Sequence, residues 1–198
     1  MEKIPTLFIR DYGAAPRQGF PFPVRREVAP GCEWVLAGEG TATRKWDGTC
    51  VRLDEYGAWW ARREIKRGKP VPDGFAPIST DPETGKTVGW EPASQTGWAK
   101  HLEEAVTNSA PERAGTYELL GPRVNGNPEG FSGHVLMAHG WAPFSVRTDY
   151  ATAPRDYDGL ATWLSARTYE GIVWHHPDGR RAKIKADDFP DPAEDQSA

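Results

Sequence analysis

The 198-residue sequence is poor in cysteine and has no long apolar run. Its two cysteines, Cys32 and Cys50, are too few for a disulfide framework and predict no zinc ligand set. A membrane-spanning helix needs about 20 apolar residues, so we expect no membrane partner. Residues 1–10 also lack the charged and then apolar order of a secretory signal. These absences predict a soluble, cytoplasmic protein.

The sequence also lacks an excess of positive charge, since its net charge is −4. The acids are unevenly placed. Residues 187–198 contain five acids and no base, so the rest of the chain has a net charge of +1. This segment has the composition of a disordered acidic tail. Basic residues gather between Arg62 and Lys69, and they form a candidate surface for phosphate groups.

Periodicity predicts antiparallel strands and two principal helices. Alternating apolar residues with turn residues between them predict hairpins over 49–62 and 170–185. Apolar residues at helical spacing predict helices over 98–106 and 157–164. Asp156 is the expected N-terminal cap of the second helix.

Two shorter segments are assigned from composition. The apolar run 34–37 predicts a strand, whereas residues 66–89, with prolines, glycines and few apolar residues, predict a loop. Together these elements predict the α+β class with twisted antiparallel sheets. The length predicts one domain over residues 1–186, followed by the tail over 187–198.

The segment Lys45-Trp46-Asp47-Gly48 suits an enzyme that uses a lysine amine as a nucleophile. The glycine allows a tight turn beside a ligand, and the aspartate stays close to the lysine. A surface turn with a solvated lysine is the alternative for this motif taken alone. Cys50, on the strand expected next, is interpreted as a small buried residue rather than a reactive thiol.

Three later segments favour the interpretation of Lys45 as a nucleophile. They are Thr116-Tyr117-Glu118-Leu119-Leu120-Gly121, Glu170-Gly171-Ile172-Val173 and Lys183-Ile184-Lys185. With the Lys45 motif they resemble, in the right order, the nucleotidyltransferase motifs of ATP-dependent RNA and DNA ligases and mRNA capping enzymes. The resemblance implies a nucleotidyltransferase fold, in which two twisted antiparallel sheets with flanking helices enclose a nucleotide cleft.

Two further runs narrow the resemblance. The opening Lys3-Ile4-Pro5-Thr6-Leu7-Phe8 and the run from Gly121 to Pro128 look like a family of small RNA ligases that includes a vertebrate 5′-to-3′ RNA ligase. The resemblance spans residues 3–188. It implies an ATP-dependent RNA ligase that joins 5′-phosphate and 3′-hydroxyl RNA ends through a lysyl-AMP intermediate and then an RNA-adenylate.

The resemblance implies a function for each charged motif residue. Lys45 would attack the α-phosphate of ATP, which requires a neutral amine. Lys183 and Lys185, two residues apart on one strand face, would lower the pKa of Lys45 and neutralise the phosphate. Glu170 would face Mg²⁺, or alternatively Mn²⁺, usually through water. Glu118 would accept hydrogen bonds from the ribose hydroxyls.

The contacts to the adenine and to the sugar are assigned to residues outside the charged motif positions or beside them. Many relatives have an acid before the nucleophilic lysine, but Arg44 occupies that position here, so backbone carbonyls near it would accept the adenine amino hydrogens. Phe131, Trp141 and Phe144 are candidates for stacking on adenine, and Phe144 is favoured. Asp47 and Gly48 would orient the lysine or support the sugar, and Arg62 would lie near the mouth of the site. Each of these residues has a purely structural alternative.

Two other functions remain open. One is a capping-type guanylyltransferase or DNA ligase, which usually carries a further domain after the lysine pair. Thirteen residues follow Lys185 here, which argues against both. The other is a non-catalytic nucleotide- or RNA-binding module, which would not require a nucleophile.

Overall fold

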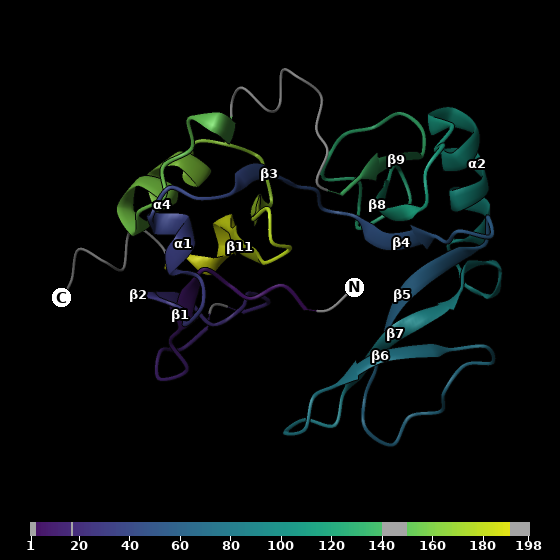
Figure 1. Cartoon of the computed structure of the whole chain (residues 1–198), viewed down its shortest axis with the longest axis horizontal. Helices are drawn as coiled ribbons and strands as arrows, with labels where there is room; N and C mark the ends of the chain where they lie inside the picture. Colours follow the sequence, from purple (N-terminus) through teal and green to yellow (C-terminus); the bar gives the residue numbers. More distant parts are fainter. Residues whose placement is uncertain (1–2, 17, 140–149, 191–198) are drawn as a thin grey trace. The chain divides into compact units, whose positions relative to one another are not determined.

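The computed structural model describes residues 3–16, 18–139 and 150–190, and the chain divides into two compact units (Figure 1). Unit 1 comprises Met1–Lys3 and Trp46–Trp141, and unit 2 comprises Ile4–Lys45 and Ala142–Ala198. The chain passes from unit 2 into unit 1 directly after Lys45, so the lysine motif is shared between the units. The assignment of residues 1–186 to one domain stays a prediction.

Unit 1 is built on an antiparallel sheet with the strand order β6-β7-β5-β4-β8-β9 (Figure 1). The helix α2 (Ala99–Ser109) follows the short 3₁₀ helix η1 (Ala93–Gln95) and packs on one face of this sheet. The strands are β4 (Thr49–Leu53), β5 (Trp59–Ile65), β6 (Ala76–Thr80), β7 (Thr87–Pro92), β8 (Gly115–Leu120) and β9 (Val135–Ala138).

The core of unit 1 lies between α2 and the sheet. Val51, Leu119 and Leu136 from three neighbouring strands are buried there with Leu102 of α2. Successive side chains of a strand point to opposite faces, so the residues between these positions face away from α2. Glu118 is one of them.

Unit 2 contains the antiparallel sheet β11-β10-β3 and the smaller sheet β1-β2. Buried residues of these strands, among them Phe8, Ile172, Trp174 and Ile184, form its core with Leu160 of α4. The strands are β1 (Phe8–Arg10), β2 (Val24–Val28), β3 (Thr41–Lys45), β10 (Gly171–His175) and β11 (Arg181–Lys185). The helices are α1 (Glu33–Leu36), α4 (Tyr157–Ser165) and the 3₁₀ turn η2 (Ala186–Asp188).

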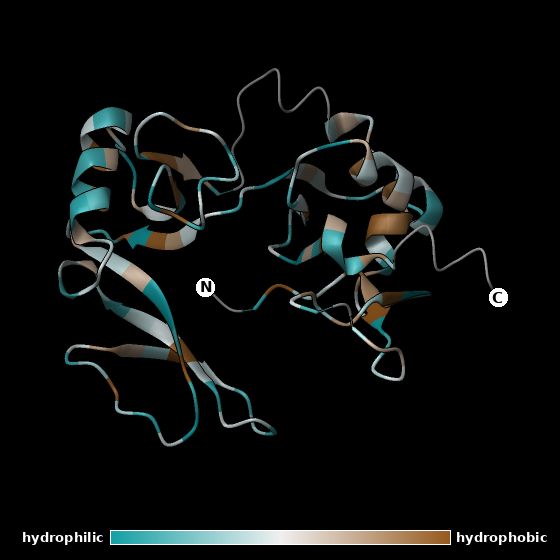
Figure 2. Ribbon diagram, turned by 180° about the vertical axis from the view of Figure 1, so that it is seen from behind, coloured by the Kyte–Doolittle hydropathy of each residue, from teal (hydrophilic) through white to brown (hydrophobic). Residues whose placement is uncertain are grey.

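The predicted hairpins and helices are present. Asp156 caps α4, because its Oδ1 accepts a hydrogen bond of 2.8 Å from the Gly159 amide. In the β4–β5 turn, Asp54 accepts bonds from the amides of Tyr56 and Ala58, which fixes the reversal. Apolar and polar segments alternate along the helices and strands in both units, as elements with one buried face require (Figure 2). The α+β class is therefore confirmed.

Two local predictions are wrong. Residues 34–37 were expected as a strand, but they fall in α1 and its C-terminal cap, where Ala37 donates its amide to the Glu33 carbonyl at 3.1 Å. A run of four apolar residues carries no periodicity that separates a helix from a strand. The predicted loop 66–89 contains β6 and the start of β7. Pro77 is tolerated there because β6 is an edge strand.

The folded body extends beyond residue 186. Asp188, expected in the disordered tail, is fully buried, and its Oδ1 accepts a bond of 2.7 Å from Arg10. The next residue, Phe189, belongs to the core of unit 2. Residues 191–198 lie outside the described ranges. No helix in those ranges combines the length and the apolar character that crossing a bilayer requires.

Candidate active site

Two of the predicted catalytic lysines meet at one glutamate in unit 2. The strand register places Gly171 of β10 opposite Lys45 on β3 and opposite Lys185 on β11. Glu170 immediately precedes Gly171, and its two carboxylate oxygens form ion pairs with the Nζ atoms of Lys45 and Lys185. The Glu170 side chain is only 12% exposed, so its carboxylate is largely shielded from water. A carboxylate at the head of an otherwise apolar strand needs a partner, and Glu170 has two.

Lys183 shares the sheet face of this cluster. It lies two residues before Lys185 on β11 and opposite Val173 of β10. Burial lowers the pKa of Lys183 from 10.5 to about 8, and the positive charges of Lys45 and Lys185 act in the same direction. A lysine with this pKa carries its charge at neutral pH and loses it under mildly alkaline conditions.

Gly171 is required by the close approach of β10 to β11. A Cβ atom at this position would lie 2.0 Å from the carbonyl oxygen of Ile184 and 2.8 Å from the Cα of Lys185. Backbone atoms of a neighbouring strand cannot move aside as the end of a flexible side chain can. The glycine therefore lets the strand that bears Lys185 lie close to the start of β10, next to Glu170.

We expect Gly171→Ala to lower the free energy of unfolding by about 1–3 kcal/mol, because the added methyl group overpacks the sheet. Gly115→Ala is the matched control, since Gly115 also begins a strand but a Cβ there would meet no atom within 4 Å. Urea unfolding followed by circular dichroism compares the two variants. Equal losses in both would contradict the proposed crowding.

Asp188 is a positioning residue that the sequence did not reveal. Its Oδ2 accepts a bond of 2.8 Å from the backbone amide of Lys185. Its other oxygen is held by Arg10, which comes from the opposite end of the chain. Asp188 thus fixes the end of the strand that carries Lys185. Nothing in an acidic pair at the head of an acidic segment indicated this.

In unit 1, Asp47 and Gly48 are tied to the loop that follows β8. Asn125 Nδ2 donates to Asp47 Oδ1 and to the Gly48 carbonyl, both at 2.9 Å. A Cβ at Gly48 would lie 2.3 Å from the Leu119 carbonyl oxygen. The glycine of the motif is therefore needed for a close approach to β8. Asn125 belongs to the Gly121–Pro128 run, so that run contacts the lysine motif directly.

Glu118 lies in a polar group on the sheet face turned away from α2. Cys50 of β4 is its direct cross-strand neighbour. The Glu118 Oε2 atom is 2.8 Å from Nε2 of His139, the residue that follows β9. Cys50 is half-buried and stands outside the core, so its interpretation as a small buried residue of the strand is wrong. His139 was not among the predicted site residues, because its position relative to Glu118 depends on strand pairing.

The other residues predicted to contact the nucleotide belong to different units of the chain. The Arg44 guanidinium lies 4.1 Å from the Tyr169 ring centroid, and strand alternation turns it to the face opposite Lys45. Arg62 of β5 pairs in register with Trp90 in unit 1, on the same sheet face as Glu118. Phe131 is 6.4 Å from Trp46, centroid to centroid, in unit 1. Phe144 and Trp141 lie outside the described residues.

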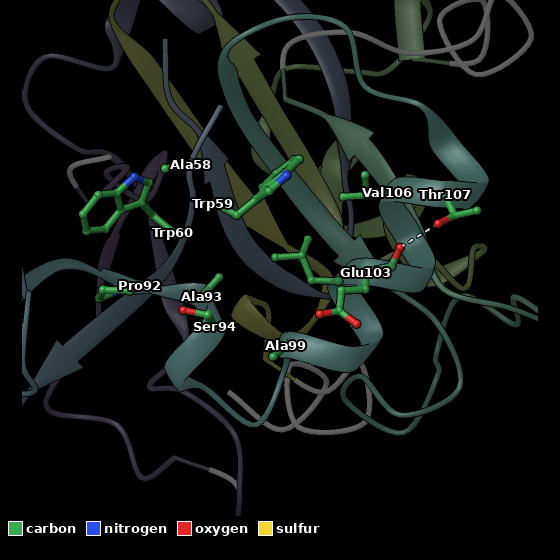
Figure 3. A pocket seen from close by; sticks show the side chains of 11 residues that line it. Ala58, Trp59, Trp60, Pro92, Ala93, Ser94, Ala99, Glu103, Val106 and Thr107 are labelled. Carbon is green, nitrogen blue, oxygen red and sulfur yellow. Dashed lines mark hydrogen bonds between the residues drawn. The ribbon is translucent and has the colours of Figure 1, made fainter. Parts of the chain in front are cut away.

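A cavity of about 550 Å³ lies elsewhere in unit 1, beside β5, η1 and α2 (Figure 3). The two indole rings of Trp59 and Trp60 extend in different directions from β5, and Glu103 and Thr107 contribute polar groups from α2 (Figure 3). No predicted site residue lines this cavity. Its walls are mainly apolar, and it offers no cation to a phosphate group.

The sequence resembles RNA ligases. It is 27% identical to RNA ligase 1 of Pongo abelii, and 28% identical to the proteins of that name from Rattus norvegicus and Danio rerio. Each match extends over 161 residues and covers 64% of this chain and 45% of the relative. The chain thus spans less than half the length of these relatives. No protein-family model matches the sequence.

Proposed function

We propose that this protein is an ATP-dependent RNA ligase with a nucleotidyltransferase fold. The observation that carries this proposal is that Lys45 and Lys185 pair with one largely buried glutamate while Lys183 shares their strand face. A lysine nucleophile requires cations beside it that can receive a phosphate group. The similarity to proteins named RNA ligase 1 supports RNA as the substrate.

The first chemical step would form a phosphoramidate on Lys45. The neutral Nζ attacks the α-phosphorus of ATP. The bond between that phosphorus and the oxygen that bridges the α- and β-phosphates breaks, and pyrophosphate leaves. Glu170 already accepts a bond from this Nζ, so it is placed to take the proton that Lys45 must lose. Lys183 and Lys185 offset the negative charge of the phosphate.

The next two steps would transfer AMP and seal the RNA. The 5′-phosphate of RNA attacks the Lys45-bound phosphorus and takes AMP, which regenerates the lysine. A 3′-hydroxyl then attacks the 5′-phosphorus and releases AMP. Glu118 would accept hydrogen bonds from the ribose hydroxyls, which requires that its carboxylate exchange the bond to His139 for the sugar.

Glu170 also fits the expected metal. Mg²⁺ prefers oxygen ligands and keeps several waters, so one carboxylate is a sufficient protein ligand. Its two oxygens are paired with the Lys45 and Lys185 amines in this structure, so the metal would take the place of one of these amines. When bound, Mg²⁺ would help to neutralise the phosphates of ATP.

Intact-mass measurement after incubation with ATP or GTP and Mg²⁺ tests this function. An added AMP supports the ligase. An added GMP would instead indicate a capping-type guanylyltransferase, and no adduct with either nucleotide would indicate a binding module. The same preparation should then seal a nicked or stem-loop RNA that carries a 5′-phosphate and a 3′-hydroxyl.

The basic surface after β5 is the proposed RNA contact. Lys66, Arg67 and Lys69 are exposed, whereas the nearby Arg63 is paired with Glu91 at 3.2 Å. Replacing the three exposed residues with Gln should flatten the salt dependence of sealing, by about 0.7 in log–log slope for each phosphate of a single strand that is no longer neutralised. Formation of the AMP adduct should be unchanged, because that step needs no RNA.

The matched control is a double variant, Lys100→Gln with Arg113→Gln, which removes exposed cations elsewhere in unit 1. It should leave the salt dependence as in the wild type. If the triple variant keeps the wild-type slope, RNA binds to a different surface.

The lowered pKa of Lys183 predicts how the affinity for ATP depends on pH. Its folded-state pKa of about 8 lies below 10.5, so its positive charge is present at pH 7 and is lost as the pH rises through 8. Above that value the free enzyme must take up a proton to bind phosphate, and the affinity for ATP should fall by up to about tenfold per pH unit. Lys183→Arg keeps its charge and should flatten this decline. The measurement is KM for ATP in adduct formation from pH 7 to about pH 9, and identical pH slopes would contradict the assignment.

A further inference from the structure

A thiol, a carboxylate and an imidazole gather on the face of the unit 1 sheet that is turned away from α2. Cys50 and Glu118 are directly opposite on adjacent strands, and His139 follows β9, the next strand along. Their potential ligand atoms all lie within 4.8 Å of one another. Neither the Lys45 chemistry nor the core of unit 1 uses Cys50 or His139.

The His139 ring is bonded on one side only. Its Nε2 contacts Glu118 Oε2 at 2.8 Å, and this contact assigns the ring proton to Nε2 when the imidazole is neutral. In the described part of the chain, the buried Nδ1 has no hydrogen-bond partner. Nε2 is therefore the ring nitrogen that can share a cation with Glu118, and the cation would take the place of the proton between them.

We propose that Cys50, Glu118 and His139 form a site for a borderline-soft divalent cation such as Zn²⁺. Thiolate, imidazole and carboxylate are the three ligand types that zinc takes in proteins. In a tetrahedral site with these bond lengths the ligand atoms would be separated by roughly 3.3–3.6 Å. The potential ligand atoms lie within 4.8 Å of one another and those of Glu118 and His139 are 2.8 Å apart, so binding would require small adjustments of these side chains. Three protein ligands leave a fourth position open.

The thiolate gives the site its selectivity. Mg²⁺ requires oxygen ligands and would gain little from Cys50 or His139, whereas zinc is favoured by both. The side chains of Glu118 and His139 are 12% and 21% exposed, so the group is sheltered from water but accessible to an ion. This site is separate from the lysine cluster of unit 2, where the ligand chemistry favours Mg²⁺.

Zinc at this site would inhibit the ligase. This consequence rests on the proposed function, because it requires that Glu118 bind the ribose of ATP. A carboxylate that coordinates zinc cannot accept both ribose hydroxyl bonds, so the metal and ATP compete for Glu118. The coordination itself does not depend on this, and binding is measured without ATP.

The binding experiment uses Co²⁺ as a spectroscopic probe on the untagged 198-residue chain. A thiolate bound to Co²⁺ gives an intense charge-transfer absorption that nitrogen and oxygen ligands do not give. We expect this band to saturate at one Co²⁺ per chain, to disappear on addition of Zn²⁺, and to be absent in Cys50→Ser. His139→Gln should weaken binding by at least about tenfold, since even outer-shell changes weaken metal sites by that factor.

The wild-type protein provides a second readout that needs no substitution. Zn²⁺ should protect Cys50 from alkylation by iodoacetamide, as followed by peptide mass, while the fully buried Cys32 stays unmodified with or without metal. In adduct formation, Cys50→Ser should keep its basal rate and need at least about ten times more Zn²⁺ for inhibition.

The absence of a charge-transfer band in the wild type, or a band that persists in Cys50→Ser, would overturn the site. A band with no effect of Zn²⁺ on adduct formation would overturn the competition with ATP and keep the metal site. A band in a protein that forms no AMP adduct under any condition would retain the site while removing the ligase assignment.

Discussion

Lys45→Ala should abolish the AMP adduct, with a loss of at least roughly 10³-fold in the rate of its formation. Lys45 is the only group assigned as nucleophile, and the alanine side chain offers no nitrogen to the α-phosphorus. The fold should persist, because Lys45 is the last residue of β3 and Glu170 keeps its ion pair with Lys185. Intact mass after incubation with ATP and Mg²⁺ measures the adduct, and circular dichroism checks the fold.

Lys86→Ala is the matched control for this result. Lys86 also forms an ion pair with a glutamate, at 3.2 Å from Glu64, but both side chains are 44% exposed. This variant should form the adduct at the wild-type rate. An undiminished adduct in Lys45→Ala would end the proposed mechanism, because the transferred AMP would then be attached to another residue.

Glu170→Gln should slow adduct formation by about 10²–10³-fold and remove its dependence on Mg²⁺. The amide keeps the size of the side chain but cannot take a proton from Lys45 or attract a cation. Loss of the carboxylate also removes the ion pairs that Glu170 makes with the partly buried amines of Lys45 and Lys185, which lowers the free energy of unfolding by up to about 3–5 kcal/mol. Rates are therefore measured below the unfolding temperature of the variant, across a Mg²⁺ titration.

Glu91→Gln separates this chemistry from the general effect of breaking a buried ion pair. Glu91 is 8% exposed and pairs with Arg63 in unit 1. Its substitution should reduce stability and leave the Mg²⁺ dependence of adduct formation unchanged. If Glu170→Gln forms the adduct at the wild-type rate with the wild-type Mg²⁺ dependence, Glu170 is only a structural partner of the lysines.

The sequence predicted those parts of the site that depend on local patterns. Lys183 and Lys185 share a strand face because alternate residues of any strand do so, and an acid at the start of the apolar strand β10 needed a counter-charge. Both properties can be read from a few consecutive residues. The α4 cap at Asp156 is equally local.

The parts that the sequence missed depend on strand register and on chain ends. The position of His139 beside Glu118 follows from the pairing of β8 with β9, and Cys50 joins them through the pairing of β4 with β8. One oxygen of Asp188 makes a local bond to the Lys185 amide, but the other is held by Arg10, which is distant in sequence. Such pairings bring together residues whose separation along the chain has no fixed value, so no spacing rule could have found them.

Unit 2 is built from two separate stretches of the chain, so the ribosome makes its two parts at different times. Lys45 is made early, but its partners Glu170 and Lys185 follow only after the whole of unit 1 has been translated. At about 5–20 residues per second, this delay is on the order of ten seconds. Unit 1 is nearly continuous in sequence and meets its own strand partners first. The nascent chain therefore carries Lys45, the proposed nucleophile, through the synthesis of unit 1 without the glutamate that pairs with it.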